Sequence, residues 1–285
     1  MVACRGVTRP ALELRGHEFA WGSRTFLMAI VNVTPDSFSG DGLDIDTAVD
    51  HAVAQWQAGA DILDIGGEST RPGAEPVADA TELARVVPVI AGVRARVPDA
   101  VISIDTYKPS VARAAHDAGA DLINSVWGAP PDLLAVAAER HMPIAAMHNQ
   151  HGTYYGGEVV EAVAEYLNAC AKRALAAGLA PEAVILDPGI GFGKTAEQNL
   201  EVLHRLSSIS DLGFPTLLGA SRKSTIGKLT GRDARERIYG TAATTALAVA
   251  AGFDIVRVHD VAQQRDVISV SDAIVRQWRP NAWTG

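Results

Sequence analysis

The stretch from Ala58 to Gly67, AGADILDIGG, decides the fold of this chain because its order of residues returns twice. A glycine and, two positions later, an aspartate also follow Ala118 and Ala251, and each time a short apolar run comes next. Each glycine stands where a helix should end in the left-handed conformation, and each apolar run is typical of a buried strand. The pattern therefore indicates repeated strand–helix units.

The distances between these glycines give the size of one unit. Gly59 and Gly119 lie 60 positions apart, and Gly119 and Gly252 lie 133 apart. If the intervals hold two and four units, each unit has roughly 30 residues, as a βα repeat requires. Eight apolar runs are predicted as strands, at 26–33, 62–65, 101–105, 122–126, 143–148, 184–187, 216–219 and 255–259. Segments with helical spacing lie between them, among them 47–59, 77–93, 110–119, 158–178 and 236–252.

Strands that are apolar on both faces and alternate with helices indicate a parallel sheet covered by helices. Eight such units in 285 residues match a single (β/α)₈ barrel (TIM barrel) of the α/β class. The alternative is a doubly wound open sheet, which would normally carry a glycine-rich dinucleotide turn after its first strand. The first strand instead runs into Asn32-Val33-Thr34-Pro35-Asp36, which favours the barrel.

The segment 12–21, before the first strand, has the pattern of a two-stranded ribbon with a turn at Gly16-His17. We expect this short hairpin to plug the bottom of the barrel, at the N-terminal ends of its strands. No linker rich in Pro or Ser divides the chain, so we expect one domain over residues 1–285, with its core at about 26–280.

The composition argues against several classes of protein. Lys and Arg number 25 against 33 Asp and Glu, a net charge of −8, which is unfavourable for a broad nucleic-acid surface. The longest apolar stretch, 242–253, is too short to span a bilayer, and the N-terminal residues lack the apolar core of a secretory signal. Two cysteines, Cys4 and Cys170, are too few for a disulfide framework. We expect a cytoplasmic protein.

Polar side chains stand at the end of every predicted strand, where a barrel of this kind places its active site. Any one of them is well explained as a helix cap or turn residue. Eight at one rim predict a site instead. They are Asn32, Asp64, Asp105, Asn124, His148, Asp187, Ser221 (just past its strand) and His259.

The strand-end residues sort into groups of different chemistry. Asp105, Asn124 and Asp187, with Lys223 nearby, suit a flat nitrogen-rich ring, because a carboxylate accepts two N–H donors and a carboxamide both donates and accepts. A capping role is the alternative for the two aspartates, since Pro109 and Pro188 follow closely.

A second group suits an anion. Arg257 and His259 lie two positions apart, so they share one side of their strand, and Ser221 adds a hydroxyl at the neighbouring strand end. Asn32 can supply an oxygen to a metal ion. The alternative is a surface ion pair. Two loops bounded by glycine and proline, 34–42 and 66–73, are candidates to close over the site, or are ordinary surface loops.

Six motifs in order make the sequence resemble the dihydropteroate synthase family over nearly the whole chain, from about residue 26 to the last helix. The stretches are IVNVTPDSFS from Ile30, DIGGESTRPG from Asp64, SIDT from Ser103, LDPGIGFGK from Leu186, GASRK from Gly219 and RVHD from Arg257.

The resemblance implies the barrel and a reaction that joins 6-hydroxymethyl-7,8-dihydropterin diphosphate to 4-aminobenzoate, with Mg²⁺ as cofactor and release of diphosphate. It implies a dissociative mechanism, a homodimer and a sulfonamide target. By position, Asp105, Asn124, Asp187 and Lys223 would bind the pterin, Asn32 the Mg²⁺, and Ser221, Arg257 and His259 the diphosphate. Phe38, Thr70, Arg71 and Pro72 would shape the aminobenzoate pocket, and Asp36 would assist Asp105, Asp187 and Lys223 in catalysis.

The sequence departs from the usual family pattern in two places. Asn124 is followed by Ser125, where many members have aspartate, and the first loop contains Ser39-Gly40-Asp41-Gly42, where Ser-Asp-Gly-Gly is common. These departures keep open a non-catalytic pterin-binding paralogue. A pterin-barrel methyltransferase acting on methyltetrahydrofolate with a corrinoid partner is a further alternative. The intact Thr70-Arg71 and Ser221-Arg222-Lys223 favour an active synthase.

Overall fold

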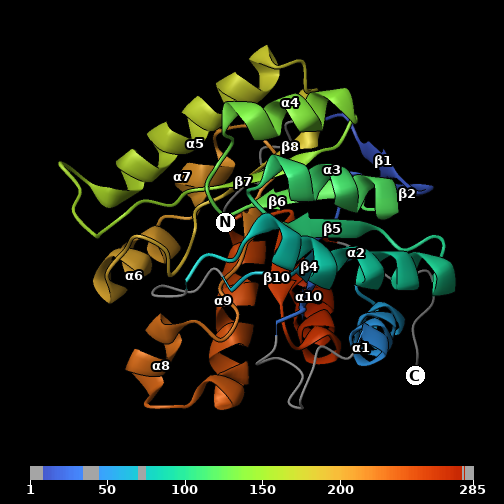
Figure 1. The fold of residues 1–285 in the computed structure, drawn as a ribbon. Helices are drawn as coiled ribbons and strands as arrows, with labels where there is room; N and C mark the ends of the chain where they lie inside the picture. Colours follow the sequence, from blue (N-terminus) through green and yellow to red (C-terminus); the bar gives the residue numbers. More distant parts are fainter. Residues whose placement is uncertain (1–8, 35–44, 70–74, 278, 280–285) are drawn as a thin grey trace.

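Eight parallel strands form a barrel at the centre of the computed structural model, which describes residues 9–34, 45–69, 75–277 and 279 (Figure 1). The strands pair in the order β8-β7-β6-β5-β4-β3-β10-β9. A parallel bridge between Leu186 and Thr216, next to β9, joins the two ends of this order, so the sheet closes on itself. The strands are β3 (Phe26–Asn32), β4 (Ile62–Gly66), β5 (Ile102–Asp105), β6 (Leu122–Ser125), β7 (Ile144–Met147), β8 (Val184–Asp187), β9 (Leu217–Leu218) and β10 (Ile255–Val258).

Helices surround the barrel, as the (β/α)₈ prediction requires, and each of the eight predicted strands is present (Figure 1). The third and fourth helices begin with a proline, which suits the first turn because its missing N–H needs no partner there. The helices are α1 (Ile45–Gln57), α2 (Asp79–Arg96), α3 (Pro109–Ala118), α4 (Pro131–Glu139), α5 (Val159–Ala176), α6 (Ala196–His204), α7 (Ser207–Ser210), α8 (Ser224–Thr230), α9 (Ile238–Ala250) and α10 (Val261–Val275). Within the described residues, none of these helices combines the length and the apolar character needed to cross a membrane.

The repeated glycines take the conformation that the sequence predicts. Gly59, Gly119 and Gly252 have φ angles of 99°, 115° and 84°, in the left-handed region. The aspartate two residues later has a role that the sequence analysis did not assign. Each accepts a backbone N–H near the start of a neighbouring strand: Asp61 from Leu27, Asp121 from Ile102 and Asp254 from Thr216, at 2.8, 2.9 and 3.0 Å.

The hairpin before the barrel closes its N-terminal end. β1 (Leu12–Leu14) and β2 (His17–Phe19) pair antiparallel, and Phe19 and Trp21 pack inside the barrel against Phe26 and the inward residues of the other strands. The turn lies at Arg15-Gly16, with φ angles of 52° and 77°. The predicted turn at Gly16-His17 is therefore one residue too late, because His17 already pairs with Leu14.

Candidate active site

A buried network of charged and polar side chains lies at the C-terminal ends of β4, β5, β6 and β10. The Arg257 guanidinium donates from Nε to Asp64 Oδ2 at 2.5 Å and from Nη2 to Asp105 Oδ2 at 2.6 Å. Asn124 donates from Nδ2 to the same Asp64 oxygen at 3.0 Å. Four strand ends therefore meet in one hydrogen-bonded group, and register places Asn124 opposite Asp105.

Arg257 lies between the two groups of residues that the sequence analysis separated. It was assigned to the anion group, and its guanidinium contacts carboxylates of the ring-binding side. Asp64 was noted only as a strand end and left out of the site. It is fully buried and accepts hydrogen bonds from both Asn124 and Arg257. Its strand-end position and its place in the motif DIGGESTRPG were the two sequence features that could have indicated a role in the site.

Two oxygens of this network have no hydrogen-bond partner among the described residues. Asp64 Oδ1 and Asp105 Oδ1 are buried acceptors of this kind, and so is the Ser125 hydroxyl. A buried acceptor without a donor is unfavourable. We call the opening of the barrel at the C-terminal ends of its strands the mouth. A ligand that brings N–H groups to the mouth would remove this cost.

Burial governs the ionisation of the network. Removal from water, with the nearby Asp64 and Glu82 charges, raises the pKa of Asp105 to about 7 against the opposing pull of Arg257. Burial disfavours the Arg257 charge as well, but Asp64 and Asp105 more than compensate and raise its pKa above the usual range. The guanidinium is therefore a fixed positive charge, and Asp105 is a carboxyl whose ionisation is opposed by its burial.

Asp187 and Lys223 form the other side of the mouth. Asp187 Oδ1 accepts the Gly189 N–H at 2.7 Å, and Lys223 Nζ lies 3.9 Å from the centroid of the Phe192 ring. Burial raises the pKa of Asp187 to about 6, against the Gly189 hydrogen bond and the charges of Lys223 and Arg257. The Lys223 charge acts on Asp105 as well as on Asp187. The four predicted ring-binding residues thus lie around one mouth.

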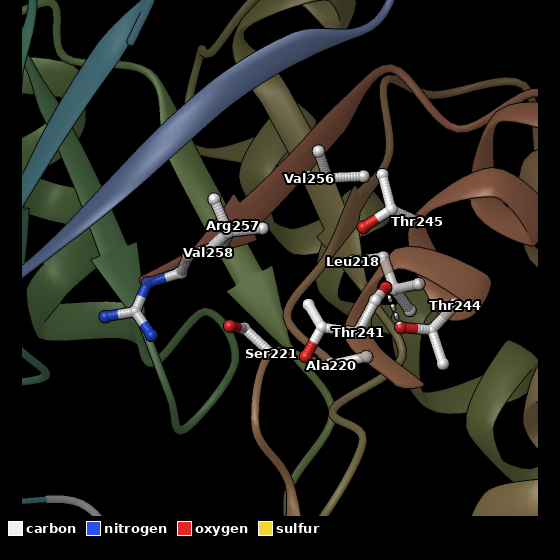
Figure 2. A pocket seen from close by; sticks show the side chains of 9 residues that line it. All are labelled: Leu218, Ala220, Ser221, Thr241, Thr244, Thr245, Val256, Arg257 and Val258. Atoms are coloured by element: carbon white, nitrogen blue, oxygen red, sulfur yellow. Dashed lines mark hydrogen bonds between the residues drawn. The ribbon is translucent and has the colours of Figure 1, made fainter. Parts of the chain in front are cut away.

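The predicted anion-binding residues lie at the ends of β9 and β10. Ser221 Oγ and His259 Nδ1 are 3.0 Å apart, and the His259 backbone N–H also donates to Ser221 Oγ. Figure 2 shows the polar ends of Ser221 and Arg257 on one side of a small pocket, with Thr244 and Thr245 of α9 on the other. Arg222 is turned to Asp260 and donates to it from Nε at 3.0 Å.

Asn32 ends β3 and pairs in register with Gly66 at the same rim. Among the described residues, no group of three or more His, Cys, Asp or Glu side chains could hold a metal ion. Mg²⁺ commonly takes only one or two protein oxygens and completes its shell with water and substrate phosphate oxygens. The single carboxamide oxygen of Asn32, on the strand that pairs with β10, fits that mode of binding.

The remaining predicted residues, Asp36, Phe38, Thr70, Arg71 and Pro72, lie outside the described residues, as do Ser39-Gly40-Asp41-Gly42. The chain on either side of 70–74 is described. The Lys108 ammonium contacts Glu68 Oε2 at 2.6 Å, Glu82 Oε2 at 2.8 Å and the Val77 carbonyl at 2.5 Å. Sequence reasoning missed this cluster, because nothing in the local pattern brings α2 and Lys108 to Glu68.

A family comparison and a comparison with individual relatives agree on the kind of protein that this chain resembles. A family described as "Pterin binding enzyme" matches residues 28–259. The chain is 46% identical to a dihydropteroate synthase of Clostridium beijerinckii over 93% of this chain and 100% of the relative. It is 46% identical to a dihydropteroate synthase of Synechocystis over 95% of this chain and 96% of the relative. It is 44% identical to one of Bacillus subtilis over 90% of this chain and 91% of the relative.

Solved structures with the same fold include enzymes with bound ligands. A Clostridium difficile dihydropteroate synthase crystallised with pteroic acid matches with a TM-score of 0.88 and 45% identity, over 90% of this chain and 99% of that one. A Xanthomonas albilineans dihydropteroate synthase with 4-aminobenzoic acid matches with a TM-score of 0.89 and 41% identity, over 95% and 99%. A Yersinia pestis dihydropteroate synthase with a sulfonamide drug matches with a TM-score of 0.86 and 38% identity, over 93% and 98%.

Proposed function

The chain belongs to the dihydropteroate synthase family of pterin-binding enzymes, transferases of folate biosynthesis, and we propose how its barrel mouth carries out the reaction. The substrates are 6-hydroxymethyl-7,8-dihydropterin diphosphate and 4-aminobenzoate, and the products are 7,8-dihydropteroate and diphosphate. One observation carries the proposal: Asp105, Asn124, Asp187 and Lys223 gather with Arg257 around one buried mouth.

Pterin recognition rests on hydrogen bonds to the ring edge. Asp105 and Asp187 would accept the amino and ring N–H groups, and Asn124 would both donate and accept. The Asp105 Oδ1 atom supports this, because it is a buried acceptor with no partner among the described residues. Lys223 would donate to a ring acceptor from its place against Phe192.

The leaving diphosphate belongs at the ends of β9 and β10. Ser221 and His259 would donate to it, and Arg257 would add its fixed positive charge. Asn32 would hold Mg²⁺ at the same place, and the ion, when bound, neutralises charge that develops on the departing oxygens. When the diphosphate leaves, the pterin ring can share the positive charge that forms at its exocyclic carbon. The carboxylates of Asp105 and Asp187 would stabilise this cation, so the diphosphate would leave before the amine of 4-aminobenzoate attacks.

The second substrate, 4-aminobenzoate, would contact Phe38, Thr70, Arg71 and Pro72, and Asp36 would help to stabilise the cation. The Xanthomonas structure with 4-aminobenzoic acid supports this class of substrate. The chain is a sulfonamide target by family, as the Yersinia structure with a sulfonamide drug indicates. We place the protein in the cytoplasm, a proposal that the free, buried thiol of Cys170 supports.

A second copy of the chain would complete the assembly as a homodimer. Large apolar side chains are exposed at helical spacing on two packed helices, Tyr239 and Leu247 on α9 and Val270 and Ile274 on α10, with exposed fractions of 57% to 87%. An exposed apolar face of this kind is typical of a contact between subunits.

The decisive experiment measures diphosphate release by the purified protein with Mg²⁺ and both substrates. We expect release that depends on 4-aminobenzoate, and a matched reaction without this substrate is the control. A folded sample that binds the pterin diphosphate in calorimetry and releases no diphosphate would instead support the non-catalytic paralogue.

A further inference from the structure

The loop after β8, LDPGIGFGK, contains a buried lysine for which the proposed reaction has no role. Lys194 is only 8% exposed. Its Nζ atom lies 3.0 Å from the Gly189 carbonyl, 3.1 Å from the Phe192 carbonyl and 2.9 Å from His148 Nδ1. An ammonium group has three N–H donors, so these three acceptors use all of them. A neutral amine has two N–H donors, so Lys194 would still donate to both carbonyls without its charge.

His148 follows β7 and joins the loop to the barrel. Burial and the Lys194 charge lower the pKa of His148 to about 3, so the ring is neutral and its Nδ1 can accept. The His148 N–H also donates to the Asp187 carbonyl at 2.8 Å. A side chain at Gly189 would place its Cβ 2.0 Å from the His148 carbonyl oxygen, and φ at this glycine is 68°. The loop therefore packs directly on the end of β7.

Both loop carbonyls that Lys194 binds lie beside groups of the mouth. Gly189, whose carbonyl Lys194 binds, donates its own backbone N–H to Asp187 Oδ1 at 2.7 Å. Phe192 supplies the ring against which Lys223 lies. Gly191, between them, faces Lys223 so closely that a Cβ there would lie 3.0 Å from Lys223 Cδ. The shape of the loop thus fixes two of the four ring-binding residues.

We propose that Lys194 is a positioning residue: by binding the Gly189 and Phe192 carbonyls and His148, it holds the loop that orients Asp187 and Lys223 for the pterin. The inference rests on the proposed function, because it assumes that those two residues bind the pterin ring. It extends that function to a residue that does not contact the substrate.

The test replaces the amine and keeps the length of the side chain. In Lys194→Met we expect KM for the pterin diphosphate to rise by about tenfold or more, because the Phe192 carbonyl loses its Lys194 donor and the Gly189 carbonyl keeps only the Phe192 N–H. KM for 4-aminobenzoate should change by less than about threefold, since Asp187 and Lys223 are not assigned to it. Backbone amides of 189–194 should exchange faster with deuterium. Lys172→Met, at an exposed lysine of α5, is the matched control.

Two variants of His148 keep the inference testable if Lys194→Met does not fold. His148→Leu removes the acceptor at Nδ1 and should raise the pterin KM. His148→Asn places an oxygen near the same position and should restore the pterin KM at least in part. The inference would be overturned if the wild-type enzyme is active and its folded Lys194→Met or His148→Leu variant keeps the pterin KM and the exchange rates of 189–194. A loss of kcat with both KM values unchanged would also overturn it. Inactivity of the wild-type enzyme would instead count against the proposed function.

Discussion

Arg257 shows at the scale of one residue how the mouth holds its carboxylates out of water. Asp64, Asp105 and Asp187 are buried, and separate burial of three anions would be strongly unfavourable. The Arg257 guanidinium bridges Asp64 and Asp105, and Lys223 acts on Asp105 and Asp187. The compensation is incomplete, since the pKa values of Asp105 and Asp187 remain raised to about 7 and about 6. Hydrogen-bond donors from a ligand would stabilise these carboxylates further.

The raised pKa of Asp187 makes a prediction about stability. Its value is about 6 in the folded chain against 3.8 for the free side chain, so the native state binds the proton more tightly. Stability should therefore fall as pH rises through this window, and the ionised carboxylate destabilises the fold above it. Asn at this position cannot ionise and can still accept the Gly189 N–H. We expect Asp187→Asn to be more stable than wild type by about 1–3 kcal/mol at about pH 8, with turnover reduced by about 10²-fold.

Urea denaturation across a pH series measures this effect. The gain in stability should shrink as pH falls through this window and approach zero below about pH 3, where the wild-type carboxyl is protonated in both states. Asp211→Asn, at an exposed position after α7, serves as control and should show no such dependence. A gain that is equal at every pH would contradict the assignment of the effect to the Asp187 charge.

Lys223 supports a prediction about binding. Lys223→Ala removes the ammonium group that lies against Phe192 and whose charge acts on Asp105 and Asp187, and we expect it to abolish measurable binding of the pterin diphosphate. In calorimetry this corresponds to an affinity loss of about 100-fold or more. Lys228→Ala, at an exposed lysine of α8, should bind as wild type does. Retained affinity in Lys223→Ala would show that Lys223 was assigned wrongly.

Strand-end chemistry predicted Asp105, Asn124, Asp187 and Lys223 as one group, because residues at the C-terminal ends of parallel strands must share a rim. It did not predict the partners of Arg257. The sequence places Arg257 and His259 on one side of β10, but which acid the long guanidinium reaches depends on strands far along the chain. Lys194 was missed for the same reason, since its acceptor His148 lies on a different unit of the barrel.

The helices and strands could be predicted better than the site, because hydrophobic periodicity and the glycines that end helices are local features of the sequence. All eight strands and the three left-handed glycines follow from short patterns. β9 is shorter than the predicted 216–219, with two residues, Leu217–Leu218, paired to β10. Short helices such as α7 (Ser207–Ser210) have too few residues to show a period. Their place is set by packing on the barrel.

The hairpin β1–β2 makes a prediction at this scale. Phe19 is 2% exposed and its ring lies 4.8 Å from that of Phe26, so it fills the closed end of the barrel. Phe19→Ala should reduce the free energy of unfolding by about 3–5 kcal/mol, because no neighbour can fill the cavity. Glu18→Ala, one residue earlier and exposed, should change it by less than about 0.5 kcal/mol. Denaturant unfolding measures both, and equal effects would show that the hairpin does not contribute to the core.

Over the whole molecule, stability and chemistry are placed at opposite ends of the same strands. Aromatic residues and the repeat aspartates close the N-terminal end, while the network of Arg257, Asp64 and Asp105 lies at the C-terminal end. Changes in the hairpin should therefore alter stability and leave both KM values near wild type. This separation allows Phe19→Ala, if it folds, to distinguish general loosening from the specific loss expected in Lys223→Ala.

The homodimer is the remaining prediction at the scale of the molecule. Leu247 and Ile274 are 57% and 73% exposed on the packed helices α9 and α10, away from α5 (Figure 1). Leu247→Glu with Ile274→Glu would place two like charges in the buried contact and repeat them through the twofold axis, which is strongly unfavourable. We expect sedimentation to show wild type as a dimer and this double variant as a folded monomer. Leu175→Glu on α5, where the leucine is 38% exposed, is the matched control and should remain dimeric. A monomeric wild type, or a double variant that still sediments as a dimer, would show that α9 and α10 do not form the contact.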